Sequence, residues 1–112
     1  MRELTVLEQI ILASIIHLGE EAYGLAIRKT AKSLSGKSLM YGALYNALDQ
    51  LSRKEYVAKH VRKPEADNGG HERIYYAVTR EGKQALRVAY RLHQSIWTSL
   101  PEITREFDRG GR

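Results

Sequence analysis

The spacing of apolar residues along the chain predicts five helices and one pair of strands. At the start, Thr5 and Glu8 match a capping box, in which each side chain accepts a hydrogen bond from the other residue's backbone N–H. Apolar residues continue at helical spacing to Leu18, and Gly19 is suited to end the helix. A helix over 5–18 that is apolar almost all round must be buried on more than one side. In so short a chain, we expect a second subunit to cover part of it.

The next two helices are expected over residues 23–33 and 40–54, joined by a short turn that contains glycine. The second of them has a buried apolar stripe. Its opposite face carries Asn46 and is flanked by Tyr41 and Tyr45. This arrangement predicts a helix-turn-helix, whose second helix can enter the major groove of DNA.

The pattern then changes to the alternation that is typical of strands, over residues 57–62 and 74–78. The loop between them contains Asp67-Asn68-Gly69-Gly70, residue types that tolerate positive φ. One face of the resulting hairpin is expected to carry Val57, Val61, Ile74, Tyr76 and Val78. A hairpin that directly follows a helix-turn-helix is a wing.

The last third of the chain predicts a long helix capped by Thr79 and a short helix that begins near Pro101. The long helix has apolar and aromatic residues close to heptad spacing, which favours packing on another helix. The residues expected at a homodimer interface are Leu7, Ile11, Leu86, Ala89, Tyr90, His93, Ile96, Trp97 and Leu100. The predicted fold is therefore mainly α. It has a winged helix-turn-helix domain with a two-stranded β-wing over 1–78, and a C-terminal dimerisation helix with a short tail over 79–112.

Composition adds few further constraints. The length of 112 residues suits one domain, and 43% hydrophobic residues can form a core. The absence of cysteine excludes disulfides and thiolate metal sites and favours a cytoplasmic location. The N-terminal apolar run is too short and too interrupted to span a bilayer, and it lacks the pattern of a signal peptide, so no membrane partner is expected.

The distribution of charge is more informative than the net charge of +5. Residues 24–63 carry nine basic and two acidic side chains, whereas residues 1–23 carry one basic and four acidic ones. Positive charge is thus concentrated around the predicted helix-turn-helix, which favours an acidic partner such as duplex DNA. The alternative is an ordinary solvated, lysine-rich face.

No pattern indicates an enzyme. The four histidines have no metal-ligand spacing, and Gly69-Gly70 lacks the strand–loop–helix setting of a phosphate loop. No Ser/His/Asp arrangement is visible. We therefore expect no catalytic residues, no metal and no cofactor.

Five segments, in order and spread over nearly the whole chain, match motifs of one known family. They are Leu4-Thr5-Val6-Leu7-Glu8, Ala22-Tyr23-Gly24, Gly42-Ala43-Leu44-Tyr45, Leu48-Asp49-Gln50-Leu51 and Tyr75-Tyr76-Ala77-Val78-Thr79-Arg80-Glu81-Gly82. In these segments the chain resembles the PadR family of bacterial transcriptional regulators, and its short C-terminal part resembles the family's compact members. The resemblance implies a winged helix and dimerisation through the C-terminal helix, which packs on the partner's first helix. It also implies repression that is relieved by small molecules, often phenolic acids or hydrophobic drugs.

The chain departs from the family pattern at two places. The family often has a serine and a proline just before the glycine of the recognition helix, where this chain has Met40-Tyr41-Gly42. The usual helix cap is thus missing, and Ser38 is expected to replace it. The wing, often arginine-rich in the family, reads Gly70-His71-Glu72-Arg73-Ile74 here. Both departures bear on the DNA sequence preference and leave the fold intact.

The expected DNA-binding residues lie on the third helix, the turn before it and the wing. They are Lys37, Ser38, Tyr41, Gly42, Tyr45, Asn46, Lys63, His71 and Arg73. Asn46 and Tyr41 are expected at base edges, and the others at phosphates or the minor groove, with Gly42 allowing close approach of the backbone. Two alternatives stay open at this point: Tyr45 packs sideways into the core, or the wing only closes the sheet.

Aromatic residues on the last long helix suggest a small-molecule site. His93 and Trp97 would stack on a flat, apolar effector, or else Trp97 is ordinary interface core. The expected function is a sequence-specific transcriptional repressor, relieved by a small aromatic effector, that binds an operator as a homodimer. The alternatives are a winged-helix protein-interaction module and a nonspecific nucleic-acid binder.

Overall fold

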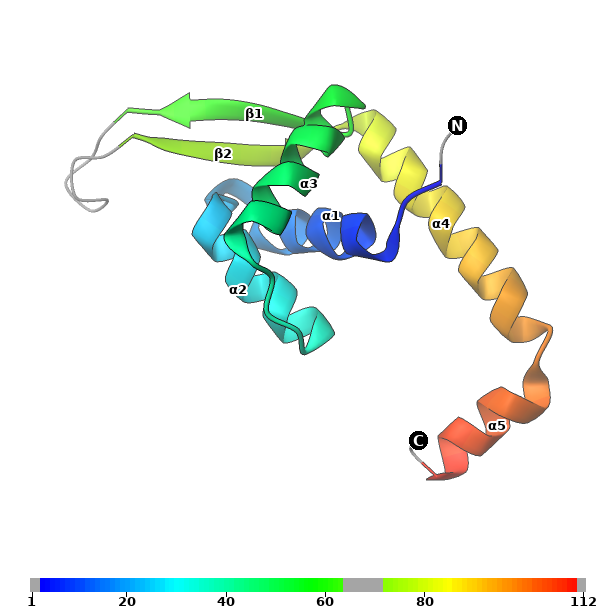
Figure 1. The fold of residues 1–112 in the computed structure, drawn as a ribbon. Coiled ribbons are helices and arrows are strands. Elements are labelled where there is room, and N and C mark those ends of the chain that lie inside the picture. The colour runs from blue at the N-terminus through cyan, green and yellow to red at the C-terminus, as the bar shows by residue number, and fades with distance from the viewer. Residues whose placement is uncertain (1–2, 64–71, 111–112) are drawn as a thin grey trace.

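A computed structural model describes residues 3–63 and 72–110. The chain forms a body of three helices and a hairpin, from which a helical arm projects, with overall extents of 54 × 31 × 22 Å (Figure 1). The elements in order are α1 (Val6–Leu18), the 3-10 turn η1 (Gly19–Glu21), α2 (Gly24–Ser35), α3 (Tyr41–Arg53), β1 (Val57–Arg62), β2 (Arg73–Val78), α4 (Arg80–Thr98) and α5 (Pro101–Gly110). The predicted helices and strands are confirmed, with ends close to those expected.

Helix α1 begins with the predicted capping box. The Glu8 N–H donates to Thr5 Oγ1 at 3.0 Å, and the Thr5 N–H donates to Glu8 Oε1 at 2.9 Å. Gly19 ends the helix with a φ of 59°, a conformation that glycine adopts without strain. Both ends of α1 are therefore set by local residues that could be recognised in the sequence.

The core lies where α1, α2 and α3 meet under the hairpin. The helical residues with at most 2% of their surface exposed include Ile11, Leu12, Ile15, Ile27, Leu44, Leu48 and Leu51. Val57, Tyr76 and Ala85 extend this cluster to β1, β2 and the start of α4. Burial of these side chains removes apolar surface from water, which is the main force that holds the three helices together.

Strands β1 and β2 pair antiparallel, with Val57 opposite Val78 and Val61 opposite Ile74. Residues directly opposite one another lie on the same face, so the predicted apolar face of the hairpin is confirmed. An isolated bridge between Tyr23 and Tyr75 was not predicted; it adds the segment before α2 to the edge of β2. A single bridge has no alternating pattern of its own, so no sequence signal predicts it.

Helix α4 is fixed closely to the turn that follows α3. Thr79 caps it by accepting the Gly82 N–H at 3.0 Å, and the Thr79 hydroxyl donates to the Glu55 carbonyl at 2.6 Å. A Cβ on Gly82 would lie 2.3 Å from the Tyr56 carbonyl oxygen, so no larger residue fits there without a shift of the backbone. The direction of α4 is thus set by the body of the molecule.

The later part of α4, and α5 after a bend, form an arm, and this arm and the hairpin project from opposite sides of the body (Figure 1). Apolar side chains along the arm are open to solvent: Tyr90 is 61% exposed and Ile96 is 47% exposed. Within residues 3–63 and 72–110, no helix is both long and apolar enough to cross a membrane.

Candidate nucleic-acid interface

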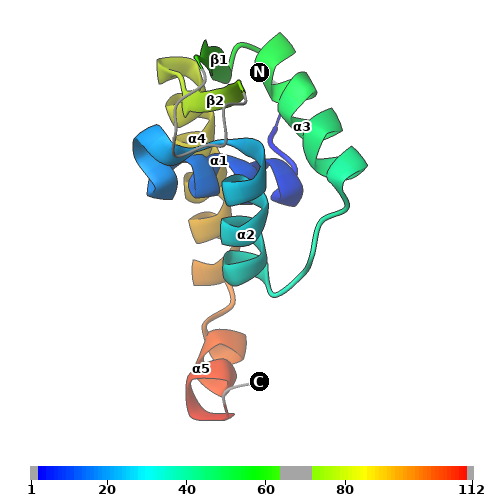
Figure 2. The same ribbon diagram turned by 90° about the vertical axis from the view of Figure 1, so that its left-hand side faces the viewer.

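Helix α3 turns its polar face away from the molecule. Leu44 and Leu48 on its inner side are 0% and 1% exposed, whereas Tyr41 and Tyr45 on its outer side are 52% and 47% exposed. Asn46 is also exposed. Figure 2 shows α3 along one side of the body and α4 on the other side. The residues expected to read bases therefore lie on an open surface, away from the helix that carries the arm.

The turn before α3 is held by a different residue from the one expected. Ser38 does not cap the helix: the N-cap residue is Met40, with no side-chain cap hydrogen bond. Instead, Arg28 Nε donates to the Leu39 carbonyl at 2.6 Å, and the Arg28 guanidinium carbon lies 4.4 Å from the centre of the Tyr41 ring. The prediction for Ser38 was wrong because α3 begins only after Met40, two residues beyond Ser38. Arg28 holds the turn through a carbonyl and does not replace a cap, which would have to accept from the free N–H groups of the helix.

Lys37 and Ser38 in this turn are both exposed. The Ser35 hydroxyl oxygen accepts the Lys37 N–H at 3.1 Å, and Gly36 has a φ of 75°, so the backbone of the turn is well defined. The side chains of Lys37 and Ser38 thus stand next to the start of α3 and are accessible to a phosphate backbone.

Tyr45 partly fits the alternative in which it packs sideways into the molecule. Its side chain is half exposed, but its hydroxyl end packs on the start of α2. The contact is so close that a Cβ on Gly24 would lie 2.1 Å from the Tyr45 hydroxyl oxygen. Gly24 is therefore required for this contact. Gly42 differs: a Cβ there would meet nothing within 4 Å, so no packing inside the chain demands a glycine.

The described part of the wing contributes two of the three expected residues. Lys63 is exposed just after β1, and the Arg73 guanidinium carbon lies 4.3 Å from the centre of the Tyr23 ring. His71 lies outside the described residues. Arg73, Tyr23 and Tyr45 line one cleft between α3 and β2, so the wing and α3 border a continuous surface.

The base of the wing is tied to the body by Arg62, whose role was not predicted. Its guanidinium carbon lies 3.8 Å from the centre of the Tyr75 ring, and a guanidinium N–H donates a hydrogen bond to the Glu20 carbonyl at 2.5 Å. Tyr75 meets Tyr23 edge to face at 5.6 Å and stacks with His60 at 5.9 Å. The strand alternation places Arg62 and Tyr75 on the same face of the hairpin, which is the sequence signal that could have revealed this contact.

A buried ion pair joins α1 to the end of α3. Lys54 Nζ lies 2.6 Å from Glu8 Oε2, and the Glu8 side chain is 8% exposed. Burial alone would raise the pKa of Glu8, but the hydrogen bonds from Lys54 and Thr5 and the charge of Lys54 outweigh it, and the pKa is lowered. Burial, together with neighbouring Tyr45 and Asp49, raises the pKa of Tyr76. Over the described ranges, no group of three or more histidine or acidic side chains is placed to hold a metal ion.

The residues expected at a dimer interface fall into two groups. Ile11 is 0% exposed and Leu7 packs against the core, so these two face the subunit's own interior and Ile11 has no surface to offer a partner. Leu86 and Ala89 also pack partly on the core. On the arm, Tyr90, His93, Ile96 and Leu100 are exposed, and Trp97 is partly buried.

The outward face of α1 is formed by other residues instead. Val6 is 72% exposed, and Ile10 and Ala13, one and two turns further on, are partly exposed. The sequence showed that α1 is apolar all round, but it did not show which of two equally apolar stripes turns inward. The position of the hairpin and of α3 decides that.

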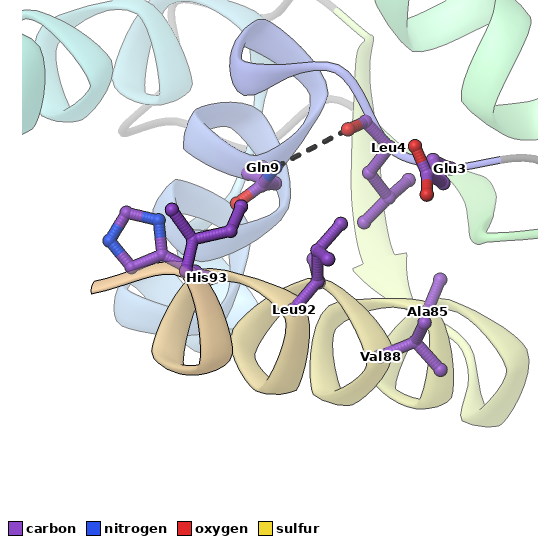
Figure 3. A pocket seen from close by; sticks show the side chains of 9 residues that line it. Glu3, Leu4, Gln9, Ala85, Val88, Leu92 and His93 are labelled. Atoms are coloured by element: carbon purple, nitrogen blue, oxygen red, sulfur yellow. Dashed lines mark hydrogen bonds between the residues drawn. The ribbon is translucent and has the colours of Figure 1, made fainter. Parts of the chain in front are cut away.

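A groove of about 270 Å³ lies between the start of α1 and α4 (Figure 3). Its lining residues are Glu3, Leu4, Gln9, Ala85, Val88, Ala89, Leu92, His93 and Ile96. The His93 and Trp97 rings lie 6.1 Å apart at 50°, yet only His93 lines the groove. Within one subunit, the two residues expected to hold an effector thus do not share a hollow.

The comparisons with known proteins agree with this geometry. The model of the PadR-like family of transcriptional regulators matches residues 11–88. A PadR family transcription regulator from Clostridium difficile R20291 is 25% identical with a TM-score of 0.69, over 87% of this chain and 97% of that one. A PadR-like regulator from Bacillus cereus is 21% identical with a TM-score of 0.70, over 88% of this chain and 91% of that one. A Streptococcus transcriptional regulator is 23% identical with a TM-score of 0.70, over 88% and 92%.

The comparison with curated protein sequences gave no match. The family match spans the helix-turn-helix, both strands and the first half of α4. The similar structures cover most of the chain and confirm the winged-helix fold. The chain therefore belongs to the PadR-like family of transcriptional regulators.

Proposed function

We propose that this regulator is a sequence-specific DNA-binding repressor that works as a homodimer and reads its operator with α3. Membership of the family gives transcriptional regulation by DNA binding. The observation that carries the finer proposal is the exposed outer face of α3, with Tyr41 at 52% and Tyr45 at 47% exposure beside Asn46. Solvent-exposed aromatic and amide groups on a helix of this fold suit contacts with base edges.

Each proposed contact follows from its chemistry. The Asn46 amide can donate and accept at once, so it pairs with an adenine edge, and Tyr41 reaches a neighbouring base. Lys37, Ser38 and the Tyr45 hydroxyl bind phosphates, which fix the register of α3 in the groove. From the wing, Lys63, His71 and Arg73 follow the adjacent backbone.

The homodimer is proposed from the arm. Ile96 and Leu100 are 47% and 38% exposed, and exposed apolar side chains in a row mark an interaction surface. In this proposal residues 1–78 bind DNA, and residues 79–112 pack on the partner together with the outward face of α1. Two α3 helices then occupy successive major grooves, about 34 Å apart.

Repression would follow when the dimer covers a promoter. A small aromatic effector, bound between the subunits near His93 and Trp97, would change the angle between them and spoil the spacing of the two α3 helices. A titration of phenolic and planar cationic compounds that follows the fluorescence of Trp97 tests this step. No change at saturating ligand would remove the effector from the proposal.

The central test is a gel-shift assay on the DNA upstream of the protein's own gene, with random duplex as competitor. We expect a shift that random duplex competes poorly, and a logarithmic affinity that falls linearly with the logarithm of salt concentration. Equal binding to random duplex would indicate a nonspecific binder. Weak binding that salt does not change would indicate a protein-interaction module.

A further inference from the structure

The first turn of α3 carries an unusually apolar, open surface, formed by Met40, Tyr41, Gly42 and Ala43, which we name the reading tip. Met40 is 79% exposed, more than any other large hydrophobic side chain of the described residues. Gly42 and Ala43 are exposed too, and the space around Gly42 is empty. The tip thus offers a methionine and small residues, and its only polar side-chain group is the Tyr41 hydroxyl.

The reading tip is held in place from both sides. Arg28 binds the Leu39 carbonyl at 2.6 Å and covers the Tyr41 ring at 4.4 Å, so the backbone at Met40 lies between two anchored residues. The Met40 carbonyl also accepts the N–H of Leu44, which is fully buried, at 3.0 Å. Met40 is therefore presented by a fixed backbone although its own side chain is free to adapt.

The chain segment that leads into the tip is basic, which favours an acidic partner. Residues 28–46 contain four basic side chains (Arg28, Lys29, Lys32 and Lys37) and no acidic one. A surface that combines this charge with an apolar centre fits a groove with phosphates on its edges and an apolar group on its floor. On base edges in the major groove of DNA, that apolar group is the 5-methyl of thymine.

We propose that the reading tip recognises thymine through its 5-methyl group, with Met40 as the contacting side chain and Arg28 as its positioning residue. This inference rests on the proposed function, because it needs α3 in the major groove. Methionine suits the role because its flexible, polarisable thioether adapts to a small apolar target. The absence of a side chain on Gly42 lets the helix backbone come close enough for the contact.

The test removes single methyl groups from the DNA. Binding sites are first selected from a random duplex pool with the wild-type protein, and each thymine of the enriched half-site is then replaced by deoxyuridine, which keeps every hydrogen bond. At the contacted position we expect binding to weaken about fourfold, the value for one buried methyl-sized group. At the other thymines we expect no change.

The protein side of the test uses Met40→Ala, with Leu34→Ala as the matched control, since Leu34 is an apolar residue of α2 that is 48% exposed. Met40→Ala should bind the thymine and deoxyuridine duplexes equally, whereas Leu34→Ala should keep the wild-type difference. Thermal unfolding of both variants verifies the fold. Arg28→Lys, which lacks the planar group that covers Tyr41, should reduce the thymine preference while the salt dependence stays as in the wild type.

Three results would overturn the inference in different ways. A wild-type protein that selects a defined site but tolerates deoxyuridine at every position refutes methyl recognition and leaves the proposed function standing. A wild-type protein that selects no site refutes the proposed function, and the inference with it. If Met40→Ala retains the wild-type discrimination, Met40 is not the contacting side chain and the inference fails.

Discussion

At the scale of single residues, Glu8 performs two structural roles with one carboxylate. Oε1 closes the capping box with the Thr5 N–H, and Oε2 pairs with Lys54 at 2.6 Å. Removal of one partner from a buried ion pair leaves the other charge without compensation, which costs more than the pair contributes. Both roles make Glu8 a sensitive position of α1.

Glu8→Gln should lower the free energy of unfolding by about 2 kcal/mol at pH 7. This loss is smaller than the loss on breaking a fully buried ion pair, because Lys54 keeps contact with water. The pKa of Glu8 is lowered in the folded protein, so its contribution is present above the unfolded pKa and is lost as the pH falls through the folded value. The difference in unfolding free energy between wild type and variant should therefore be smaller at pH 3 than at pH 7, since pH 3 lies about one unit below the pKa of an unfolded glutamate. Urea unfolding at both pH values measures it.

The exposed Glu20 provides the control for this experiment, since Glu20→Gln should leave stability within about 0.5 kcal/mol at either pH. An undiminished effect of Glu8→Gln at low pH would contradict the electrostatic account. Since the glutamine side-chain oxygen can still accept the Thr5 N–H, such a loss would come neither from the charge of Glu8 nor from the capping box.

Two glycines allow structural and functional roles to be separated. Gly82→Ala should destabilise the protein by about 1–3 kcal/mol, because the new Cβ would lie 2.3 Å from the Tyr56 carbonyl oxygen. Gly42→Ala should leave stability unchanged or raise it by about 0.5 kcal/mol, because alanine favours helix and the space is empty. Denaturant unfolding measures both. Operator binding by Gly42→Ala should nevertheless weaken, and unchanged affinity would show that the backbone does not approach DNA there.

At the scale of elements, the sequence predicted the helices well and their neighbours less well. The capping box at Thr5 and the stripe through Leu44 act within one turn, so the local pattern was sufficient to recognise them. Other contacts depend on how separate elements pack together: the β-bridge of Tyr23, the hydrogen bond from Arg28 to the Leu39 carbonyl, and the burial of Ile11. No local pattern encodes such contacts. For the candidate site, the outward residues of α3 were predicted and the residues that support them were not.

The wing offers a test that distinguishes support from contact. Arg62→Ala should cost about 1 kcal/mol of stability, because a partly exposed cation–aromatic contact is lost, and should leave the salt dependence of DNA binding unchanged. Lys63→Ala should do the reverse: unchanged stability and a logarithmic salt slope shallower by about 0.9 for one phosphate contact. Denaturant unfolding and affinity at several salt concentrations measure both. Equal slopes for Lys63→Ala and the wild type would remove Lys63 from the interface.

The arm makes a separate prediction about assembly. Ile96 is 47% exposed in the subunit, so Ile96→Glu should leave the helical content unchanged and convert the proposed dimer to a monomer, because a charge cannot be buried unpaired in an apolar interface. Gln94→Glu adds the same charge on the opposite side of α4 and should remain dimeric. Light scattering during size-exclusion chromatography gives the mass. A monomeric wild type, or a dimeric Ile96→Glu, would contradict the proposed interface.

At the scale of the whole molecule, α3 and α4 occupy different sides of the same small body (Figure 2). In the proposed assembly, DNA bound at α3 and a second subunit bound at α4 would therefore not compete for the same surface. In the proposed dimer, the packing of the two subunits would then fix the separation of the half-sites.

A change in operator spacing tests this rigidity. Insertion of about 5 base pairs between the half-sites rotates one of them by half a turn and should abolish the cooperative part of the binding. Fluorescence anisotropy with wild-type and lengthened duplexes measures the effect. Equal affinity for both would mean that the two subunits bind independently, and would contradict a fixed pair of α3 helices.

The Glu8–Lys54 pair also has a mechanical consequence. It holds the far end of α3, which is about 20 Å long for 13 residues, against the beginning of α1. A tilt of only about 5° around this pivot displaces the opposite end of the helix by roughly 2 Å, about half a base-pair step, by the length of the lever alone. If α3 reads bases as proposed, a slight movement at the beginning of α1 would therefore be enlarged at the end of α3 that faces the DNA.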